Sequence, residues 1–264
     1  MISRSLTRLL FHLPLATRNR NVFRTSILPL GSRGLAATRL VDVKEEIQKL
    51  IQDSEAFCFD VDSTVITEEG IDSLAAFKGV GQEVADLTKK AMGGHVLFQD
   101  ALAERLSIIK PSKQDIQQYL TNDPFKFTED VEQLISLLHK RGKIVYLVSG
   151  GFRQMIEPVA IKLKIPTYRI YANNLLFHDD GSFKGFDPAE PTSRDGGKPA
   201  VVRMLIDAHG YKRIVMVGDG VTDMQARPPA NLFIGYGGIV VRERVRDGAD
   251  WYIYDFKDLI KILS

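Results

Sequence analysis

Short apolar runs alternate with amphipathic stretches along most of the chain. Strands are predicted where apolar residues follow one another, and helices where apolar residues recur every three or four positions, as in Val131, Leu134, Ile135 and Leu138. Alternation of this kind predicts an α/β fold with a parallel, doubly wound sheet. The predicted strands cover residues 57–59, 144–148, 168–172, 214–217, 232–234 and 251–253, and a hairpin is predicted from 175–177 and 182–185.

One long stretch, residues 68–124, interrupts this alternation. Its apolar residues have helical spacing and include no convincing strand. We therefore expect an inserted helical cap at 68–124, with the α/β core formed by residues 42–67 and 125–264. The apolar positions of the expected cap are Leu74, Phe77, Val84, Leu87, Leu97, Leu102, Leu106, Ile109 and Ile116.

Two carboxylates, Asp60 and Asp62, directly follow the first apolar run. In open α/β sheets ligands bind beyond the carboxyl ends of the strands, which is where these side chains are expected. Two acids so close together favour a hard cation with oxygen ligands, such as Mg²⁺. Taken alone, the pair is equally compatible with a solvated turn that caps a helix.

Three further stretches follow the same logic. The run Ser149-Gly150-Gly151 comes after a strand and leads into a helix, so its hydroxyl and N–H groups are expected to face an anion. Lys198 opens an amphipathic helix, and Asp219 and Asp223 follow the strand at 214–217. An anion site beside a metal site is therefore predicted.

In this order, the motifs resemble those of the haloacid dehalogenase superfamily of phosphohydrolases. A narrower resemblance, to the phosphoserine phosphatase family, runs from about Ala56 to the C-terminus. The residues that carry it are Asp62-Ser63-Thr64-Val65, Glu68-Glu69-Gly70-Ile71-Asp72, Ala91-Met92-Gly93-Gly94, Ser149-Gly150-Gly151-Phe152-Arg153-Gln154-Met155, Asn173-Asn174-Leu175 and Gly218-Asp219-Gly220.

The resemblance implies a Rossmann-like core with a helical-bundle cap and Mg²⁺-dependent hydrolysis of O-phospho-L-serine, the last step of L-serine biosynthesis. Asp60 would be the nucleophile that forms an aspartyl phosphate, and Asp62 the general acid and base. Asp60, the backbone carbonyl of Asp62, and Asp219 would hold Mg²⁺. Asp223 would orient the metal-bound waters or Lys198.

The resemblance also implies which residues bind the substrate. Ser149, Lys198 and backbone N–H groups would stabilise the phosphoryl group, Glu69 would meet the ammonium, and Arg105 would clamp the carboxylate. The remaining substrate-binding residues implied are Met92, which would form an apolar wall, Gly93, Gly150, Gly151 and Thr222.

Other functions share the chemistry of Asp60. One alternative is hydrolysis of another small phosphomonoester, or transfer of the phosphoryl group to an alcohol. Another is a receiver-like signalling module that stores phosphate on an aspartate, although the expected cap, the chain length and Asp62 argue against it.

The first 41 residues differ in composition from the rest. They contain seven Arg and no Asp, Glu or Lys, which is typical of a transit peptide and predicts the mitochondrial matrix. The alternative is an unstructured basic tail on a cytoplasmic protein. Removal of this leader takes the net charge from +2 to about −5, so we expect no binding to nucleic acid.

The remaining composition fits a globular α/β protein. No apolar run approaches the roughly 20 residues that would span a membrane, and none is expected to do so. Cys58 is the single cysteine, so no internal disulfide can form. A homodimer is a further possibility that the sequence leaves open.

Overall fold

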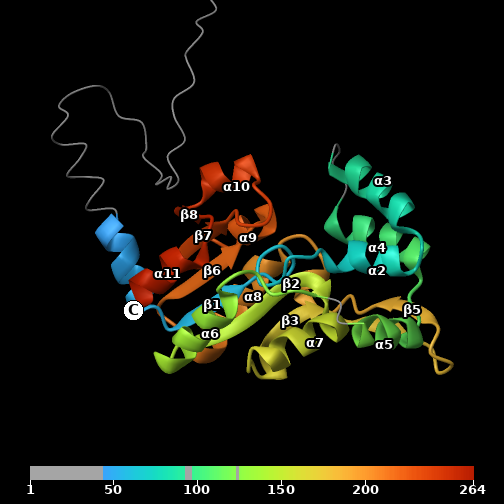
Figure 1. The fold of residues 1–264 in the computed structure, drawn as a ribbon, viewed down its shortest axis with the longest axis horizontal. Helices are drawn as coiled ribbons and strands as arrows, with labels where there is room; N and C mark the ends of the chain where they lie inside the picture. Colours follow the sequence, from blue (N-terminus) through green and yellow to red (C-terminus); the bar gives the residue numbers. More distant parts are fainter. Residues whose placement is uncertain (1–43, 93–96, 123–124) are drawn as a thin grey trace, which may run out of the picture.

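The computed structural model describes residues 44–92, 97–122 and 125–264. Its centre is a parallel six-stranded sheet with helices on both faces, which confirms the predicted α/β class (Figure 1). The strand order is β3-β2-β1-β6-β7-β8. The strands β2 and β3 are therefore added on one side of β1, and β6, β7 and β8 on the other. The strands are β1 (Ala56–Phe59), β2 (Ile144–Phe152), β3 (Ile170–Asn173), β6 (Ile214–Gly218), β7 (Leu232–Tyr236) and β8 (Trp251–Ile253).

Strand β1 occupies the middle of the sheet. Ala56 pairs with Ile144 of β2 on one side and with Ile214 of β6 on the other. All four β1 residues are buried, as expected for an apolar strand covered on both faces. The residue that follows β1 therefore emerges at the switch point where α/β sheets bind ligands.

Two layers of helices cover this sheet. Residues 44–53, α6 (Val131–Lys140), α7 (Arg153–Lys162) and α11 (Phe256–Leu263) contribute to one apolar core. The opposite face packs against α8 (Gly197–His209), with α9 (Val221–Gln225) and α10 (Glu243–Gly248). The buried positions on α6 are the four predicted ones, Val131, Leu134, Ile135 and Leu138.

Four helices lie together beside the sheet, as predicted for residues 68–124: α2 (Gly70–Phe77), α3 (Gly81–Met92), α4 (Phe98–Ile109) and α5 (Lys113–Thr121) (Figure 1). They share a third apolar cluster with the hairpin of β4 (Leu175–Phe177) and β5 (Phe183–Phe186). The hairpin itself was predicted, but its packing against these helices was not. The division of the chain into a cap at 68–124 and a core at 42–67 and 125–264 stays a prediction.

Several predicted strands have different bounds in the structure, and β2 and β3 differ most. The 144–148 strand continues as β2 to Phe152, with a change of register between Val148 and Phe152. The 168–172 strand begins later, at Ile170, because Thr167–Arg169 form a 3₁₀ turn after Pro166. Among the helices of the described ranges, none combines the length and hydrophobicity needed to cross a bilayer.

Candidate active site

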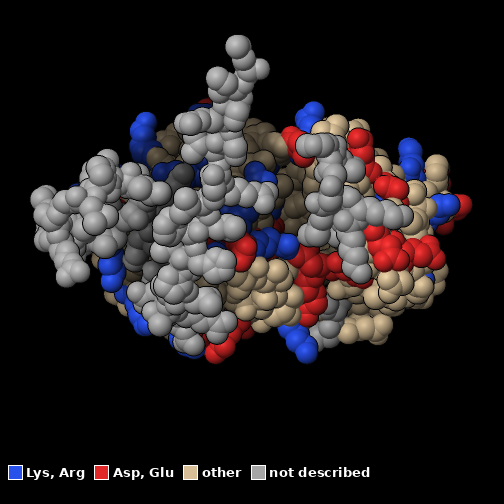
Figure 2. All heavy atoms as spheres, turned by 90° about the horizontal axis from the view of Figure 1, so that it is seen from above, with Lys and Arg blue, Asp and Glu red and all other residues tan. Residues whose placement is uncertain are grey.

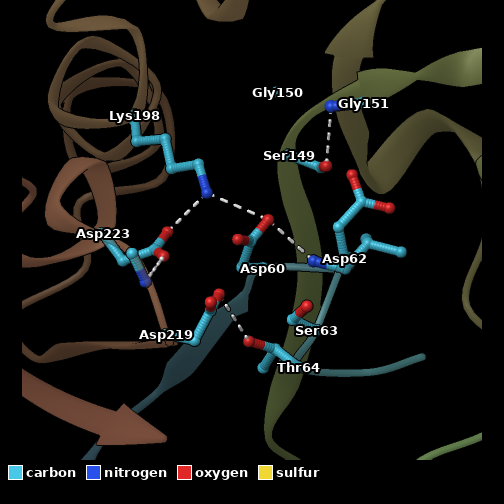
Figure 3. Close-up of polar contacts among 12 residues, drawn as sticks. Asp60, Asp62, Ser63, Thr64, Ser149, Gly150, Gly151, Lys198, Asp219 and Asp223 are labelled. Atoms are coloured by element: carbon cyan, nitrogen blue, oxygen red, sulfur yellow. Dashed lines mark hydrogen bonds and ion pairs between the residues drawn. The ribbon is translucent and has the colours of Figure 1, made fainter. Parts of the chain in front are cut away.

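The predicted site residues of the core meet at the carboxyl edge of the sheet. Asp60 follows β1, Ser149 lies near the end of β2, and Asp219 follows β6. Because these three strands are neighbours, their ends place the side chains around one point (Figure 3). Lys198 and Asp223 reach the same point from α8 and α9.

Asp60 is held in a fixed orientation. The residue is only 7% exposed, and Oδ1 accepts hydrogen bonds from the N–H of Val61 at 2.8 Å and from Nζ of Lys198 at 2.9 Å. Its backbone N–H donates to the carbonyl of Val217 at 2.9 Å, which ties the residue to β6. Both of these contacts are on Oδ1, so among the described residues Oδ2 is the oxygen left for a ligand.

Lys198 bridges two carboxylates. Its Nζ lies 2.9 Å from Oδ1 of Asp60 and 2.5 Å from Oδ1 of Asp223, which is fully buried. Burial alone would lower the pKa of Lys198, but the charges of Asp223 and Asp60 outweigh it and raise the pKa above its ordinary value. The ammonium is therefore a permanent positive charge beside Asp60.

Three acids form a group that fits a cation. Carboxylate oxygens of Asp60, Asp219 and Asp223 lie within 4.8 Å of one another. Burial and the charge of Asp60 raise the pKa of Asp219 above its ordinary value and that of Asp223 well above it. A divalent cation would relieve this repulsion, and oxygen ligands match hard ions such as Mg²⁺.

The predicted ligand Asp62 stands apart from this carboxylate group. Its carboxylate points toward Ser149 and Gly151, away from the three acids (Figure 3). The prediction placed the metal on its backbone carbonyl, which the side-chain geometry does not test. Asp223, predicted to orient the metal-bound waters or Lys198, lies beside Asp60 and Asp219 and contacts Lys198.

The carboxyl of Asp62 is suited to carry a proton. Burial, reinforced by the charges of Glu69 and Asp60, raises its pKa well above the ordinary value. Oδ1 accepts a hydrogen bond from the N–H of Gly70 at 3.0 Å. A Cβ at Gly151 would lie only 2.9 Å from Oδ2, so this approach of β2 to Asp62 requires a glycine.

Ser149 provides a buried hydroxyl next to Asp62. Its Oγ accepts a hydrogen bond from the N–H of Gly151 at 2.9 Å, which leaves the hydroxyl proton free to be donated to an anion. The carbonyl of Gly150 accepts from Nδ2 of Asn173 at 2.7 Å. These residues belong to β2, and α7 begins at Arg153, so they lead into a helix as predicted, after one further strand residue, Phe152.

Glu69 and Arg105 face the same cavity as Asp60 and Asp62. Oε1 of Glu69 accepts a hydrogen bond from the hydroxyl of Ser63 at 2.7 Å. Arg105 is half-buried on α4, and its Nε donates to the carbonyl of Ala101 at 3.1 Å. Burial lowers the pKa of Arg105, while Asp72 and Glu69 act in the opposite direction.

Some of the other predicted substrate-binding residues line the cavity, and some lie outside the described part of the structure. Thr222, on α9, lines the cavity, as do Gly150 and Gly151. Met92 is the last residue of α3, and its side chain is outside the described part of the structure. Gly93 also lies outside the described residues.

Arg242 is a cavity residue that the sequence analysis missed. It immediately precedes α10, and its Nε lies 2.9 Å from Oδ2 of Asp219 while its Nη2 lies 3.5 Å from Oε1 of Glu69. It therefore connects Asp219 of the core with Glu69, the residue that precedes α2. The loop that follows β7, a strand adjacent to β6, carries Arg242, and attention to the ends of all central strands could have found it.

Comparisons with known proteins agree with this geometry. A family model of haloacid dehalogenase-like hydrolases matches residues 55–230. The chain is 49% identical to the phosphoserine phosphatase of Mus musculus over 81% of this chain and 96% of that protein. It is 51% identical to the chloroplastic phosphoserine phosphatase of Arabidopsis thaliana over 83% of this chain and 75% of that one.

A solved structure of a substrate-bound phosphoserine phosphatase complex has the same fold. The TM-score is 0.70 at 27% identity, and the match covers 80% of this chain and 99% of that one. The chain therefore belongs to the haloacid dehalogenase-like hydrolases and, within them, to the phosphoserine phosphatase family.

Proposed function

We propose that the protein hydrolyses O-phospho-L-serine to L-serine and phosphate through an aspartyl phosphate on Asp60. The observation that carries this proposal is the arrangement of two unlike carboxyl groups. Asp60 is oriented by Lys198 and the Val61 N–H, whereas Asp62 has a raised pKa and faces Ser149. A nucleophile and a proton donor are the two groups that cleavage of an alkyl phosphate needs.

In the first step, an oxygen of Asp60 forms a bond to phosphorus as the bond to the serine oxygen breaks. Asp62 gives its proton to the departing oxygen, so serine leaves as a neutral alcohol. The Ser149 hydroxyl and the Lys198 ammonium stabilise the charge on the transferring phosphoryl group, with the N–H groups of Gly93 and Gly150 and the Thr222 hydroxyl as further donors.

In the second step, water attacks the aspartyl phosphate. Asp62, now a carboxylate, accepts a proton from this water, and the bond between Asp60 and phosphorus breaks to release inorganic phosphate. Asp62 is thereby reprotonated and Asp60 is free again. Two easier displacements replace one slow hydrolysis.

We propose Mg²⁺ as the cofactor, held by Asp60, Asp219 and the backbone carbonyl of Asp62. When bound, it would neutralise negative charge so that a carboxylate can approach a phosphate. Asp223 would act through Lys198, since the two side chains lie 2.5 Å apart. The close approach of the Asp60 and Asp219 carboxylates supports their part of this assignment.

Recognition of the amino acid is proposed for the α2–α5 side of the cavity. Glu69 would pair with the ammonium, Arg105 would bind the carboxylate through its planar fork, and Met92 would form an apolar wall. Glu69 and Arg105 line the cavity, which supports their part of the proposal.

A panel of phosphomonoesters, assayed for phosphate release with and without Mg²⁺, tests the proposed function. O-phospho-L-serine should be the preferred substrate, and chelation of the metal should remove activity. A preference for another monoester would show that O-phospho-L-serine is not the main substrate. Rapid transfer of the phosphoryl group to added alcohols would favour a phosphotransferase. A phosphoenzyme that persists far longer than seconds would favour the receiver-like alternative.

Arg105→Ala should lower kcat/KM for O-phospho-L-serine by about one to two orders of magnitude, because a desolvated charge-assisted pair is lost. Phosphoethanolamine, which has no carboxylate, should be nearly indifferent to the change. Arg105→Lys should restore only part of the loss, since an ammonium cannot form the bidentate contact. Steady-state kinetics on both substrates measure the ratio.

Equal losses on the two substrates would contradict the carboxylate role of Arg105. They would show that Arg105 only supports the packing of α4. Glu69→Gln is the matched comparison, because both substrates carry the ammonium and both should be impaired.

We also propose that residues 1–41 direct import into the mitochondrial matrix. The Arg-rich, acid-free composition supports targeting, and the Arabidopsis relative is named chloroplastic, which is a precedent for an organellar member. A fluorescent protein fused behind residues 1–41 should accumulate in mitochondria. Replacement of the seven Arg by Gln in the fusion is the control, and a diffuse cytosolic signal from the unaltered fusion would refute the proposal.

For partners, we propose the small-molecule substrate and, as an open alternative, a second copy of the chain in a homodimer. The described body gives no basis for nucleic-acid binding, since its formal charge is mildly acidic once the leader is set aside. Light scattering on purified protein would establish the oligomeric state.

A further inference from the structure

Four cationic side chains line the active-site cavity: Lys198, Arg242, Arg105 and Arg194. Lys198 is held by Asp60 and Asp223, and Arg242 by Asp219 and Glu69. These two charges are already neutralised by carboxylates in contact with them. The substrate proposal uses Arg105 and leaves Arg194 without a role.

Arg194 is the most accessible of the four cations. It is exposed, while Lys198 is buried and Arg105 and Arg242 are intermediate. It lies between the 3₁₀ turn Pro191–Ser193 and α8, which begins at Gly197 and carries Lys198 in its first turn. Within the described part of the chain, no carboxylate forms an ion pair with Arg194, so its charge faces the solvent at the mouth.

The neighbouring acid, Asp195, is occupied elsewhere. Its Oδ2 accepts a hydrogen bond from the N–H of Phe98 at 3.3 Å, and its own N–H donates to Oε1 of Gln99 at 3.3 Å. These two contacts join the 194–196 loop to the first turn of α4, which also carries Arg105. They place Arg194 at the rim of the cavity and direct the Asp195 carboxylate to the helix backbone.

The surroundings of the mouth make such a cation useful. The carboxylates of Asp60, Glu69 and Asp219 line the cavity and would repel an approaching phosphate dianion. Figure 2 shows Lys and Arg side chains next to Asp and Glu side chains near the middle of the upper face. A free positive charge at the rim offsets that repulsion along the path of entry.

We propose that Arg194 is a rim cation that captures dianionic phosphomonoesters from solution before they reach Lys198 and Ser149. This role rests on the proposed phosphatase activity and adds to it a determinant of substrate capture. Arg194 acts on the approach of the substrate and does not touch the reacting atoms. It should therefore affect kcat/KM and leave kcat unchanged.

The size of the effect follows from Coulomb's law. A unit charge about 8 to 10 Å from a dianion in water changes the local substrate concentration by about three- to fivefold at low salt. Arg194→Gln should lower kcat/KM by that factor, and Arg194→Glu, which reverses the charge, by about ten- to twentyfold. Both losses should shrink toward none at about 0.5 M salt, because the Debye length then falls to a few ångströms.

The experiment measures kcat and KM of the full protein from about 20 mM to 0.5 M salt. Arg203→Gln is the matched control: Arg203 is also exposed, lies on α8, and is outside the set of described residues that line the cavity. It removes the same charge and should have little effect. Inorganic phosphate, used as a competitive inhibitor, should show the same charge and salt dependence as the substrate.

Three results would overturn the proposal: a fall in kcat, a loss in kcat/KM that does not depend on salt, or an equal loss in Arg203→Gln. An aryl phosphate is assayed in parallel with O-phospho-L-serine, since both are phosphate dianions. If only the aryl phosphate is hydrolysed, the proposed substrate fails while the role of Arg194 is still tested.

Discussion

Asp60→Asn is expected to lower kcat for O-phospho-L-serine by at least about 10⁴-fold, because an amide cannot attack phosphorus and form the covalent intermediate. The structure explains why no neighbour should replace it. Asp219 is already paired with Arg242, and Asp223 is fully buried against Lys198. Single-turnover phosphate release measures the loss.

The asparagine variant should remain folded. Asn is nearly isosteric with Asp, and its side-chain oxygen can still accept the hydrogen bond from Val61. Thermal unfolding provides the check, and Asp53→Asn, at an exposed acid just before β1, is the matched control with expected normal activity. Substantial turnover by folded Asp60→Asn protein would exclude Asp60 as the nucleophile.

Asp62→Asn is expected to slow phosphorylation of the enzyme by O-phospho-L-serine by about 10²- to 10⁴-fold. Serine is a poor leaving group and needs the proton that the raised pKa of Asp62 keeps in place. The phenolate of an activated aryl phosphate is stable enough to leave without a proton. Phosphorylation of the enzyme by such a substrate should therefore be slowed far less. Rapid-quench burst rates on the two substrates give the comparison.

Equal losses on both substrates would argue against the acid role of Asp62. In that case its main effect would be to position the loop between β1 and α2, through the contact with the N–H of Gly70. The second step is a further check. Dephosphorylation of the aspartyl phosphate needs Asp62 as a base, so it should be slow for both substrates.

The parallel sheet could be predicted because its signals are local. Central strands such as β1 and β6 are short, wholly apolar runs that end in Asp60 and Asp219. The extension of β2 to Phe152 could not be predicted, because Ser149-Gly150-Gly151 has low strand propensity and its contact with Asn173 of β3 joins distant parts of the chain. The packing of the β4–β5 hairpin against α2–α5 depends on contacts between distant parts of the chain.

In the site, too, residues with local sequence signals could be predicted, and residues placed by distant contacts could not. Asp60, Asp62, Ser149, Lys198 and Asp219 stand at strand ends or helix starts with recognisable spacing, and the structure brings them together. Arg242 and Arg194 were missed because each is a single arginine in a loop without a motif. Arg242 follows the exposed apolar run 239–241, which gives no sign that its side chain reaches Asp219.

Trapping of the phosphoenzyme tests the central claim most directly. Asp62→Asn protein is mixed with a ³²P-labelled aryl phosphate and Mg²⁺, quenched within milliseconds to seconds, and cleaved into peptides. The account predicts label, approaching one phosphate per chain, on the peptide that contains Asp60, and none in the Asp60→Asn, Asp62→Asn double variant. Label on another residue, or label that persists in the double variant, would contradict it.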